Sequence, residues 1–285
     1  MSSNEDDRSS DDVRQQGYLS PVTLTIAGSD SGGGAGVQAD LKTFAALDCY
    51  GTSAITCLTA QNPDEVAGVE AVEPEMVALQ VATVCKGFPV AAAKTGMLYS
   101  APVIQSVVDV LKTVHLPFLC VDPVMVATSG ARLLREDAVE TLCGRLLSLA
   151  SVVTPNLDEA VILCGHEISS VEAMREAAKE IGEKFGISCV LKGGHLTGGS
   201  DGADTVSDVL YHEGNLIEER FPRIQARETH GTGCTFSAAL TARVARGDDL
   251  PTAFRTARLF VADALARPVH AGTHFPLGIR LQSGA

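Results

Sequence analysis

A short segment near the C-terminal end of the chain has the composition of an anion-binding turn. Gly231, Thr232 and Gly233 precede a helix that apolar spacing predicts over residues 234–246. Two glycines at the start of a helix leave backbone N–H groups unshielded by side chains, and the positive end of the helix dipole favours an anion there. A Gly-rich turn is also common loop chemistry, so the assignment depends on what else the chain brings to the same anion.

Cys234 is the first residue of this predicted helix. The helix N-terminus is expected to lower the pKa of its thiol towards the thiolate, which would make Cys234 a base for a substrate hydroxyl. The alternative for Cys234 is a buried and inert cysteine.

Three further residues follow predicted strands and supply the remaining parts of a phosphoryl-transfer site. Lys192 precedes Gly193 and Gly194, which clear space for a large group, and its ammonium can bind a phosphate as a point charge. Asp122 and Glu159 offer hard oxygen ligands for Mg²⁺, which keeps several waters and takes few protein ligands. Taken singly, both carboxylates could instead cap turns or helices. Together with the anion turn, these residues predict phosphoryl transfer.

Other nucleotide-binding motifs are absent or incomplete. Residues 34–39 fit the G-x-G-x-x-A fingerprint, but Gln61 stands where a dinucleotide site would want an acidic residue. No GxxxxGK[ST] motif is present, which rules out a P-loop nucleotide site. His166, His195 and His230 lack metal-ligand spacing, and we interpret them as ordinary loop residues.

Composition narrows the class of protein. The 285 residues carry a net charge of −13, which argues against nucleic acid as a partner, because phosphate backbones select basic surfaces. Eight cysteines are scattered without a CxxC pair and are interpreted as reduced thiols. No signal peptide or uninterrupted transmembrane stretch is found, so the prediction is a soluble cytoplasmic protein without a membrane partner.

Strands alternate with helices along most of the chain. Residues 1–20 are predicted to be a disordered acidic tail, and residues 21–285 a single domain. The alternation predicts an α/β fold with one parallel sheet and right-handed crossovers. Strands are expected at residues 22–27, 51–58, 90–93, 118–121, 151–153, 188–191, 206–211 and 216–221. Helices are expected at residues 37–47, 74–85, 101–114, 136–149, 157–163, 171–185, 234–246 and 252–267.

In a parallel sheet the loops beyond the carboxyl ends of the strands carry function. We therefore expect distant segments to meet along one edge of the sheet. They are residues 28–36, 60–62, 94–98, 122–125, 154–159, 192–195 and 231–234.

These segments, in this order, resemble the hydroxymethylpyrimidine/phosphomethylpyrimidine kinases of thiamine biosynthesis, in the ribokinase-like superfamily. The resemblance covers nearly the whole chain apart from the acidic tail and the last few residues. It is carried by AGSD at 27–30, GAGVQADLKTF at 34–44, KTGML at 94–98, DPVM at 122–125, TPNLDE at 154–159, KGGH at 192–195 and HGTGC at 230–234.

The resemblance implies a three-layer fold, with a central, mainly parallel sheet flanked by helices on both faces. It also implies a usually dimeric kinase that uses ATP and Mg²⁺. It implies an anion hole at residues 231–234 with Cys234 at the catalytic position, and Lys192, Asp122 and Glu159 around Mg-ATP. It also implies a pyrimidine pocket, in which Thr59 departs from the more apolar residue expected there. The implied pocket residues are Ala35, Asp40, Thr59, Gln61, Met97 and Val124.

Two alternatives stay open. Pyridoxal kinases share this fold and chemistry, but the Gln61 amide offers a donor beside an acceptor, which matches an aminopyrimidine edge that pyridoxal lacks. The second alternative is a non-catalytic ligand-binding or regulatory protein on the same fold. The presence of Lys192, Glu159 and Cys234 argues against this alternative.

Overall fold

The computed structural model describes residues 20–125, 136–194 and 205–280, so the predicted tail lies almost wholly outside the described residues. These residues form one nine-stranded sheet with the order β3-β2-β1-β4-β5-β6-β7-β8-β9. Its strands are β1 (Val22–Asp30), β2 (Tyr50–Gln61), β3 (Val66–Ala71), β4 (Val90–Thr95), β5 (Leu119–Val121), β6 (Val152–Val153), β7 (Ser188–Lys192), β8 (Thr205–His212) and β9 (Asn215–Pro222).

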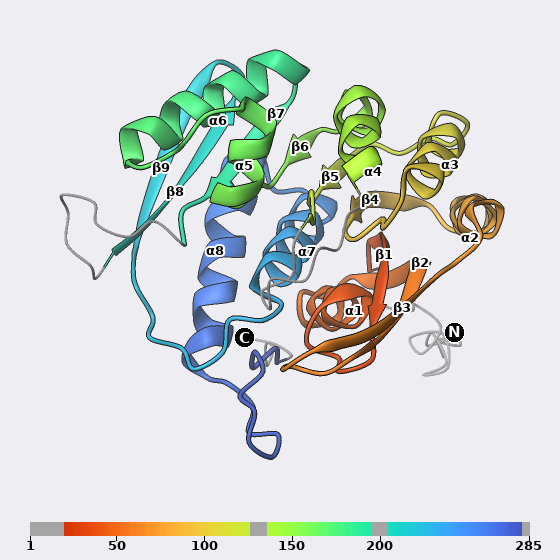
Figure 1. The fold of residues 1–285 in the computed structure, drawn as a ribbon, viewed down its shortest axis with the longest axis horizontal. Helices are drawn as coiled ribbons and strands as arrows, with labels where there is room; N and C mark the ends of the chain where they lie inside the picture. The colour runs from red at the N-terminus through yellow and green to blue at the C-terminus, as the bar shows by residue number, and fades with distance from the viewer. Residues whose placement is uncertain (1–19, 126–135, 195–204, 281–285) are drawn as a thin grey trace, which may run out of the picture.

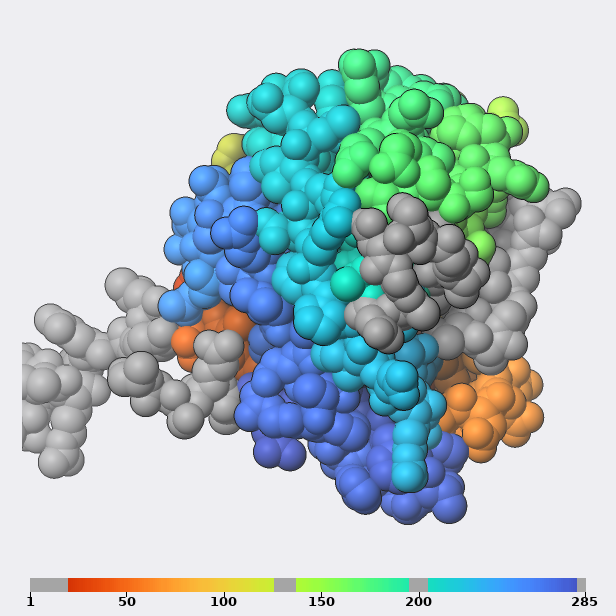
Figure 2. All heavy atoms as spheres, turned by 90° about the vertical axis from the view of Figure 1, so that its left-hand side faces the viewer, coloured from red at the N-terminus to blue at the C-terminus, as the bar shows by residue number. Residues whose placement is uncertain are grey.

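The central strands are parallel and the outer ones are not. β2, β1, β4, β5, β6 and β7 pair in parallel, whereas β3, β8 and β9 are antiparallel to their neighbours. Parallel pairing directs the carboxyl ends of the central strands to one edge. Figure 2 shows β8 and β9 (cyan) at the surface, between α6 (green) and the C-terminal region (blue).

Eight α-helices of the described residues connect and cover these strands (Figure 1). They are α1 (Gly36–Ala46), α2 (Pro74–Gly87), α3 (Ala101–Leu111), α4 (Glu136–Thr141), α5 (Leu157–Cys164), α6 (Val171–Phe185), α7 (Thr232–Ala245) and α8 (Leu250–Ala266). In the parts of the chain that the structure describes, no helix combines the length and apolarity needed to cross a membrane.

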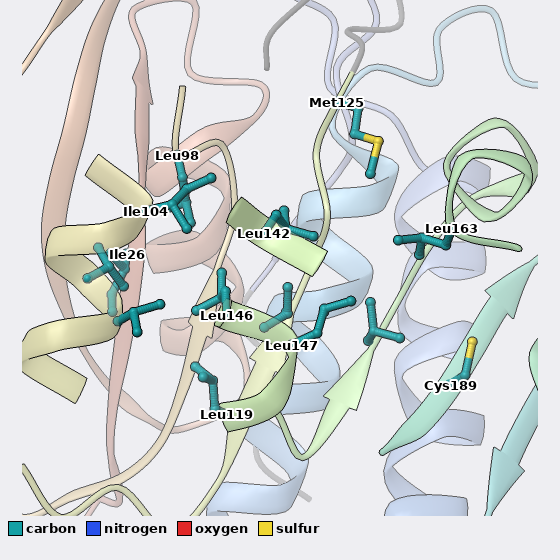
Figure 3. Packing of buried hydrophobic residues seen from close by; sticks show 14 of the residues in the cluster. Ile26, Leu98, Ile104, Leu119, Met125, Leu142, Leu146, Leu147, Leu163 and Cys189 are labelled. Carbon is teal, nitrogen blue, oxygen red and sulfur yellow. The ribbon is translucent and has the colours of Figure 1, made fainter. Parts of the chain in front are cut away.

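Two apolar clusters place the helices on opposite faces of the sheet. Leu119 and Val121 of β5 belong to a cluster with α2, α3, α4, α5 and α6, part of which Figure 3 shows. Cys120, between them, belongs to a second cluster with α1, α7 and α8. Successive side chains of a strand point to opposite faces, so the sheet lies between two helix layers. The predicted three-layer α/β fold with a mainly parallel sheet is confirmed.

Local sequence signals explain several helix boundaries. α5 begins with a capping box in which the Asn156 side chain accepts from the Glu159 N–H, and the Glu159 carboxylate accepts from the Asn156 N–H. α6 is capped by Ser170 and stopped by Gly186 in the left-handed region. The Asp249 side chain caps α8.

The largest differences between the predicted and the observed elements lie at three places. β1 continues to Asp30 because the start of the glycine loop still pairs with β2. β3 was not predicted, since it is a largely exposed edge strand that pairing with β2 defines. The predicted helix at 136–149 is divided into α4, a π-helical turn (Leu142–Leu146) and a 3-10 turn (Leu147–Leu149).

Candidate active site

A cavity of about 290 Å³ lies at the carboxyl edge of the parallel strands. Each central strand contributes a residue at its end or in the loop that follows. These residues are Asp30 from β1, Gln61 from β2, and Met97, Asp122, Asn156 and Lys192 from β4, β5, β6 and β7. Segments distant in sequence therefore meet at one edge, as the parallel topology predicts.

Two glycine segments approach each other closely at this cavity. Gly231 has a φ of +83°, and a Cβ atom there would lie 1.9 Å from the backbone oxygen of Gly34. Gly36 has a φ of +57°, and its Cβ would lie 2.4 Å from the backbone oxygen of Gly28. A side chain at Gly231 would separate the turn at residues 231–234 from the glycine loop at residues 28–36, and a side chain at Gly36 would disrupt the fold of that loop.

The turn at residues 231–234 is the start of a helix. α7 begins at Thr232, two residues earlier than predicted, with Gly231 as its N-cap residue. The N–H groups of Gly233 and Cys234 lie in the first turn and have no acceptor within the helix. A Cβ at Gly233 would lie 3.4 Å from Lys192 Nζ and 3.9 Å from Asp122 Oδ2. The free N–H groups thus adjoin charged side chains.

Asp122, Glu159 and Lys192, which we call the charged cluster, all line the cavity. Lys192 Nζ donates to Asp122 Oδ1 at 3.2 Å, and Ser237 Oγ donates to Asp122 Oδ2 at 3.0 Å. Burial opposes ionisation of Asp122, but Lys192 and Lys94 outweigh it and hold the pKa of Asp122 below its usual value. Burial likewise opposes protonation of Lys192, yet Asp122 and Glu159 raise its pKa. Both groups are therefore charged at neutral pH.

Glu159 has a second role besides capping α5. Burial raises its pKa to about 7, with Lys192 opposing that shift and Asp122 adding to it. Two carboxylates that disfavour each other's ionisation suit a divalent cation, and Mg²⁺ needs only one or two of them. No group of three or more His, Cys, Asp or Glu side chains in the described ranges could hold a metal. The residues present fit Mg²⁺ with water and phosphate completing its ligands.

The thiol of Cys234 differs from the sequence prediction. Burial raises its pKa to about 12, and the negative charges of Asp40 and Asp122 add to the shift. Lys94 and a hydrogen bond with the Gly36 backbone oppose it without reversing it. The expected lowering of this pKa was wrong, because burial disfavours the charged thiolate.

Asp40 also differs from its predicted place. Its side chain lies outside the lining of the cavity and is fully buried on α1. Its carboxylate accepts from Lys94 Nζ at 2.8 Å and from Thr25 Oγ1 at 2.6 Å. Asp40 therefore does not line the cavity, in contrast to its predicted place in the pocket wall. Lys94 was not predicted to pair with it.

The other predicted pocket residues line the cavity: Ala35, Thr59, Gln61, Met97 and Val124. Thr59 Oγ1 lies 2.9 Å from the backbone oxygen of Ser29 and 3.1 Å from Gln61 Oε1. Gln61 Nε2 lies 3.4 Å from His230 Nε2. The amide at the end of β2 therefore has a polar neighbour on each side.

The sequence analysis missed two residues of this wall. His230, interpreted as an ordinary loop residue, lies 3.1 Å from Asp30 Oδ2 through its Nε2 atom. The Asp30 carboxylate also accepts from the backbone N–H groups of Gly32, Gly34 and Ala35. Burial opposes ionisation of Asp30, but His230 and the N–H groups of Ala35 and Gly32 keep its pKa below the usual value. We call Asp30, Thr59, Gln61 and His230 the amide cluster.

A signal for His230 was present in the sequence. It precedes Gly231 in a turn expected to meet residues 28–36 at the same sheet edge, although its position in the sequence does not by itself direct its side chain towards that loop. The other histidines behave differently. His166 is exposed and pairs with Glu180 at 2.9 Å, and His195 lies outside the described residues.

A sequence profile described as phosphomethylpyrimidine kinase matches residues 30–277, which include both clusters. The chain belongs to the phosphomethylpyrimidine kinase family.

Curated relatives support this membership. The hydroxymethylpyrimidine/phosphomethylpyrimidine kinase of Haemophilus influenzae is 42% identical over 250 residues, covering 87% of this chain and 92% of the relative. The thiamine biosynthesis bifunctional protein ThiED of Geobacter sulfurreducens is 45% identical over 256 residues. The match covers 89% of this chain and 51% of that longer protein.

The solved structures similar to this chain include kinases of two kinds, phosphomethylpyrimidine kinases and pyridoxal kinases. Phosphomethylpyrimidine kinase from Clostridium difficile has a TM-score of 0.75 at 37% identity, with 86% of this chain and 99% of that chain covered. An ADP complex of Bacillus subtilis pyridoxal kinase has a TM-score of 0.82 at 36% identity, with 91% and 97% covered. The overall fold therefore does not separate the two kinase activities.

The cavity of this kinase continues beyond the charged cluster. Arg258 of α8 lies 2.9 Å from Asp208 Oδ2 of β8, and Asp208 Oδ1 accepts from the Gly193 N–H at 2.8 Å. These contacts connect α8 and β8 to the turn that carries Lys192. The sequence analysis assigned none of this part, whose lining includes Val206, Asp208, Arg223, Ile224, Arg258, Val261 and Leu265.

Proposed function

We propose that this chain transfers the γ-phosphoryl group of ATP to 4-amino-5-hydroxymethyl-2-methylpyrimidine and then to its monophosphate, giving the diphosphate used in thiamine biosynthesis. Family membership makes it an ATP-dependent phosphotransferase. The observation that carries the proposal is the joining of two kinds of surface in one cavity. The charged cluster and the free N–H groups of α7 suit a transferring phosphoryl group, and the amide cluster suits a neutral heterocycle.

Each group of the charged cluster has a role in the transfer. Lys192 balances negative charge on the transferring phosphoryl oxygens, and the N–H groups of Gly233 and Cys234 bind the same oxygens. Asp122 and Glu159 would hold Mg²⁺, which would neutralise negative charge on the phosphates of ATP.

Cys234 is proposed as the group that accepts the proton of the substrate hydroxyl. It lines the cavity in the first turn of α7, beside the free N–H groups. Because its pKa is about 12, only a small fraction of the free enzyme carries the thiolate at neutral pH. Proton transfer through Cys234 therefore makes turnover rise with pH.

The remainder of the cavity gives ATP a place for its nucleoside. The wall formed by Val206, Val261 and Leu265 is apolar, and Arg223 and Ile224 lie nearby on the lining. An aromatic base can pack against aliphatic side chains there while its phosphates extend to Lys192.

Phosphorylation of pyridoxal is the second candidate function. It is favoured by the TM-score of 0.82 with the pyridoxal kinase of Bacillus subtilis. The Gln61 amide at the end of β2 favours the aminopyrimidine, because pyridoxal has no exocyclic amine beside a ring nitrogen.

A side-by-side kinase assay with Mg-ATP tests both activities. It compares the aminopyrimidine alcohol, its monophosphate and pyridoxal, and measures ADP release at several substrate concentrations. We expect the two pyrimidines to have the higher kcat/KM. A higher kcat/KM for pyridoxal would reverse the ranking, and no heterocycle-dependent ADP release would reject the kinase activity.

We further propose a cytoplasmic homodimer. The resemblance to a usually dimeric family supports the dimer, and eight free cysteines are compatible with a reducing compartment. Light scattering at two protein concentrations measures the oligomeric mass, and a monomeric mass at both would exclude the dimer.

A further inference from the structure

The hydrogen bonds of the amide cluster are not all compatible with one orientation of the Gln61 amide. His230 Nε2 lies between two groups, 3.1 Å from Asp30 Oδ2 and 3.4 Å from Gln61 Nε2. A ring nitrogen either donates or accepts at one time. Asp30 is ionised and accepts only, so His230 Nε2 must carry its proton towards Asp30.

A protonated His230 Nε2 cannot also accept from the Gln61 NH₂ group. In that orientation two donors face each other. A half-turn of the amide about its Cγ–Cδ bond places Oε1 towards His230 and Nε2 towards Thr59. The oxygen can then share the proton that His230 donates to Asp30.

Thr59 is compatible with the same orientation. Its hydroxyl has one proton and lies 2.9 Å from the Ser29 backbone oxygen, which can only accept. Once Thr59 donates to Ser29, its oxygen has lone pairs left and accepts from the Gln61 NH₂ group. Thr59 is only 8% exposed, so water cannot easily replace this contact.

We propose that Thr59 is a specificity-determining residue which, opposite His230, fixes the orientation of the Gln61 amide and so selects ligands by the order of donor and acceptor on their edge. This inference rests on the proposed function for its substrate. The amide NH₂ on the Thr59 side then faces the ring nitrogen of the aminopyrimidine, and the amide oxygen on the His230 side faces its amino group.

The orientation predicts discrimination against a ligand with the reversed edge. The 4-oxo analogue, in which a carbonyl replaces the amino group, presents a ring N–H beside an acceptor oxygen. With the amide fixed, its NH₂ group faces the ring N–H of this analogue and its oxygen faces the carbonyl oxygen, so neither hydrogen bond forms. We therefore expect the parent to have a kcat/KM about a hundredfold higher for the aminopyrimidine than for the 4-oxo analogue. An amide free to turn would accept either ligand.

The experiment measures kcat and KM of the full chain for the two pyrimidine alcohols. Thr59→Val keeps the shape of the side chain but removes the acceptor for the amide. We expect the ratio of kcat/KM values to fall about tenfold or more, mainly through a raised KM for the aminopyrimidine. Thr59→Ser restores the hydroxyl and is expected to keep the parent's ratio.

A matched control separates this effect from general damage to β2. Thr52 lies on the same strand outside the cavity lining, and its hydroxyl donates to the Thr23 backbone oxygen at 2.8 Å. We expect Thr52→Val to keep the parent's ratio of kcat/KM. The proposal is overturned if Thr59→Val also keeps it, or if Thr59→Ser loses as much as Thr59→Val.

Failure of the proposed function gives a different result. If the parent turns over neither alcohol, the kinase assignment to this substrate is rejected, and calorimetry then measures dissociation constants of both pyrimidines for the same chains. A binding ratio that falls in Thr59→Val alone supports the fixed amide. An unchanged ratio, or no binding of either pyrimidine to the parent, overturns it.

Discussion

The two clusters of the cavity differ in how complete they are without a ligand. In the amide cluster, Thr59, Gln61 and His230 have polar neighbours within the protein. In the charged cluster, Asp122 raises the pKa of Glu159 while both carboxylates act on Lys192. The first cluster is organised by neutral and paired groups, whereas the second retains unfavourable charge that a cation and phosphates would balance.

This difference separates selection from catalysis. Preformed hydrogen bonds reject a ligand of the wrong pattern, because its buried polar groups stay unpaired. Charged side chains without a full set of partners can stabilise a transition state, because the charge that develops in the transition state supplies the missing partner. Substitutions in the amide cluster should therefore alter substrate preference, and those in the charged cluster should alter kcat.

The largest expected effect concerns a residue beneath both clusters. Lys94 is fully buried and pairs with Asp40 at 2.8 Å, and its charge also acts on Asp122 and Cys234. Lys94→Met leaves a buried carboxylate unpaired, which we expect to lower the free energy of unfolding by about 3–5 kcal/mol. Urea denaturation measures it.

The double variant Lys94→Met/Asp40→Leu is the control, since it removes both charges and should be less destabilised than the single variant. A single variant within about 1 kcal/mol of the parent would show that the pair is not needed for stability.

The next effect breaks the charged cluster alone. Lys192→Ala removes the cation beside Gly233 and is expected to lower kcat on the order of a hundred- to a thousandfold. The KM for the pyrimidine should change only a few-fold, because the charge acts mainly in the transition state. Steady-state kinetics with the exposed Lys179→Ala as control measure both constants. A larger change in KM than in kcat would contradict the assignment of catalysis to the charged cluster and of substrate selection to the amide cluster.

Cys234→Ser tests the proton acceptor of the transfer. We expect normal folding and a loss in kcat of about a hundredfold, because a hydroxyl replaces the proposed thiolate. The pKa of about 12 predicts a further signature in the parent. Its kcat should rise about tenfold per pH unit between pH 7 and 9, as the thiolate fraction rises. Activity of Cys234→Ser within a few-fold of the parent would remove Cys234 from this role.

Gln61→Leu breaks the amide cluster alone. The parent's kcat/KM for the aminopyrimidine should exceed that for pyridoxal by about a hundredfold, since two buried polar groups lack partners with pyridoxal. The variant should lose most of this ratio while keeping its interaction with ATP. Competition assays with both alcohols measure it, and Gln105→Leu on the surface of α3 is the control. An unmoved ratio would mean that Gln61 does not face the substrate.

The smallest expected effect concerns pH and Glu159. Its pKa is raised from 4.5 to about 7, so the folded chain binds a proton more tightly than the unfolded chain. Ionisation therefore costs stability as pH rises from about 4.5 through 7, while the carboxylate becomes available to Mg²⁺ only above about 7.

Calorimetry with Mg-ATP should accordingly show apparent affinity falling by up to tenfold per pH unit below about 7. Glu159→Gln, which keeps an acceptor for the Asn156 N–H, should have weaker affinity with little dependence on pH. The same pH dependence in this variant would exclude Glu159 as its cause.

The sequence by itself determined the framework and the strand-edge arrangement. Alternating strands and helices predicted one parallel sheet with helical crossovers, because apolar periodicity follows backbone geometry. Parallel strands direct their ends to one edge, so the meeting of Asp122, Lys192 and Gly233 followed from order alone.

Only the tertiary structure decided what each group becomes at that edge. Local sequence placed Cys234 at a helix start and predicted a low pKa, but burial beside Asp40 and Asp122 raises it. Likewise, Asp40 follows the glycine loop in sequence, yet pairing with Lys94 holds it away from the cavity. His230 enters the site only because Gly231 contacts the distant Gly34. Ionisation and hydrogen bonding depend on neighbours in space, and a local pattern of residues does not contain them.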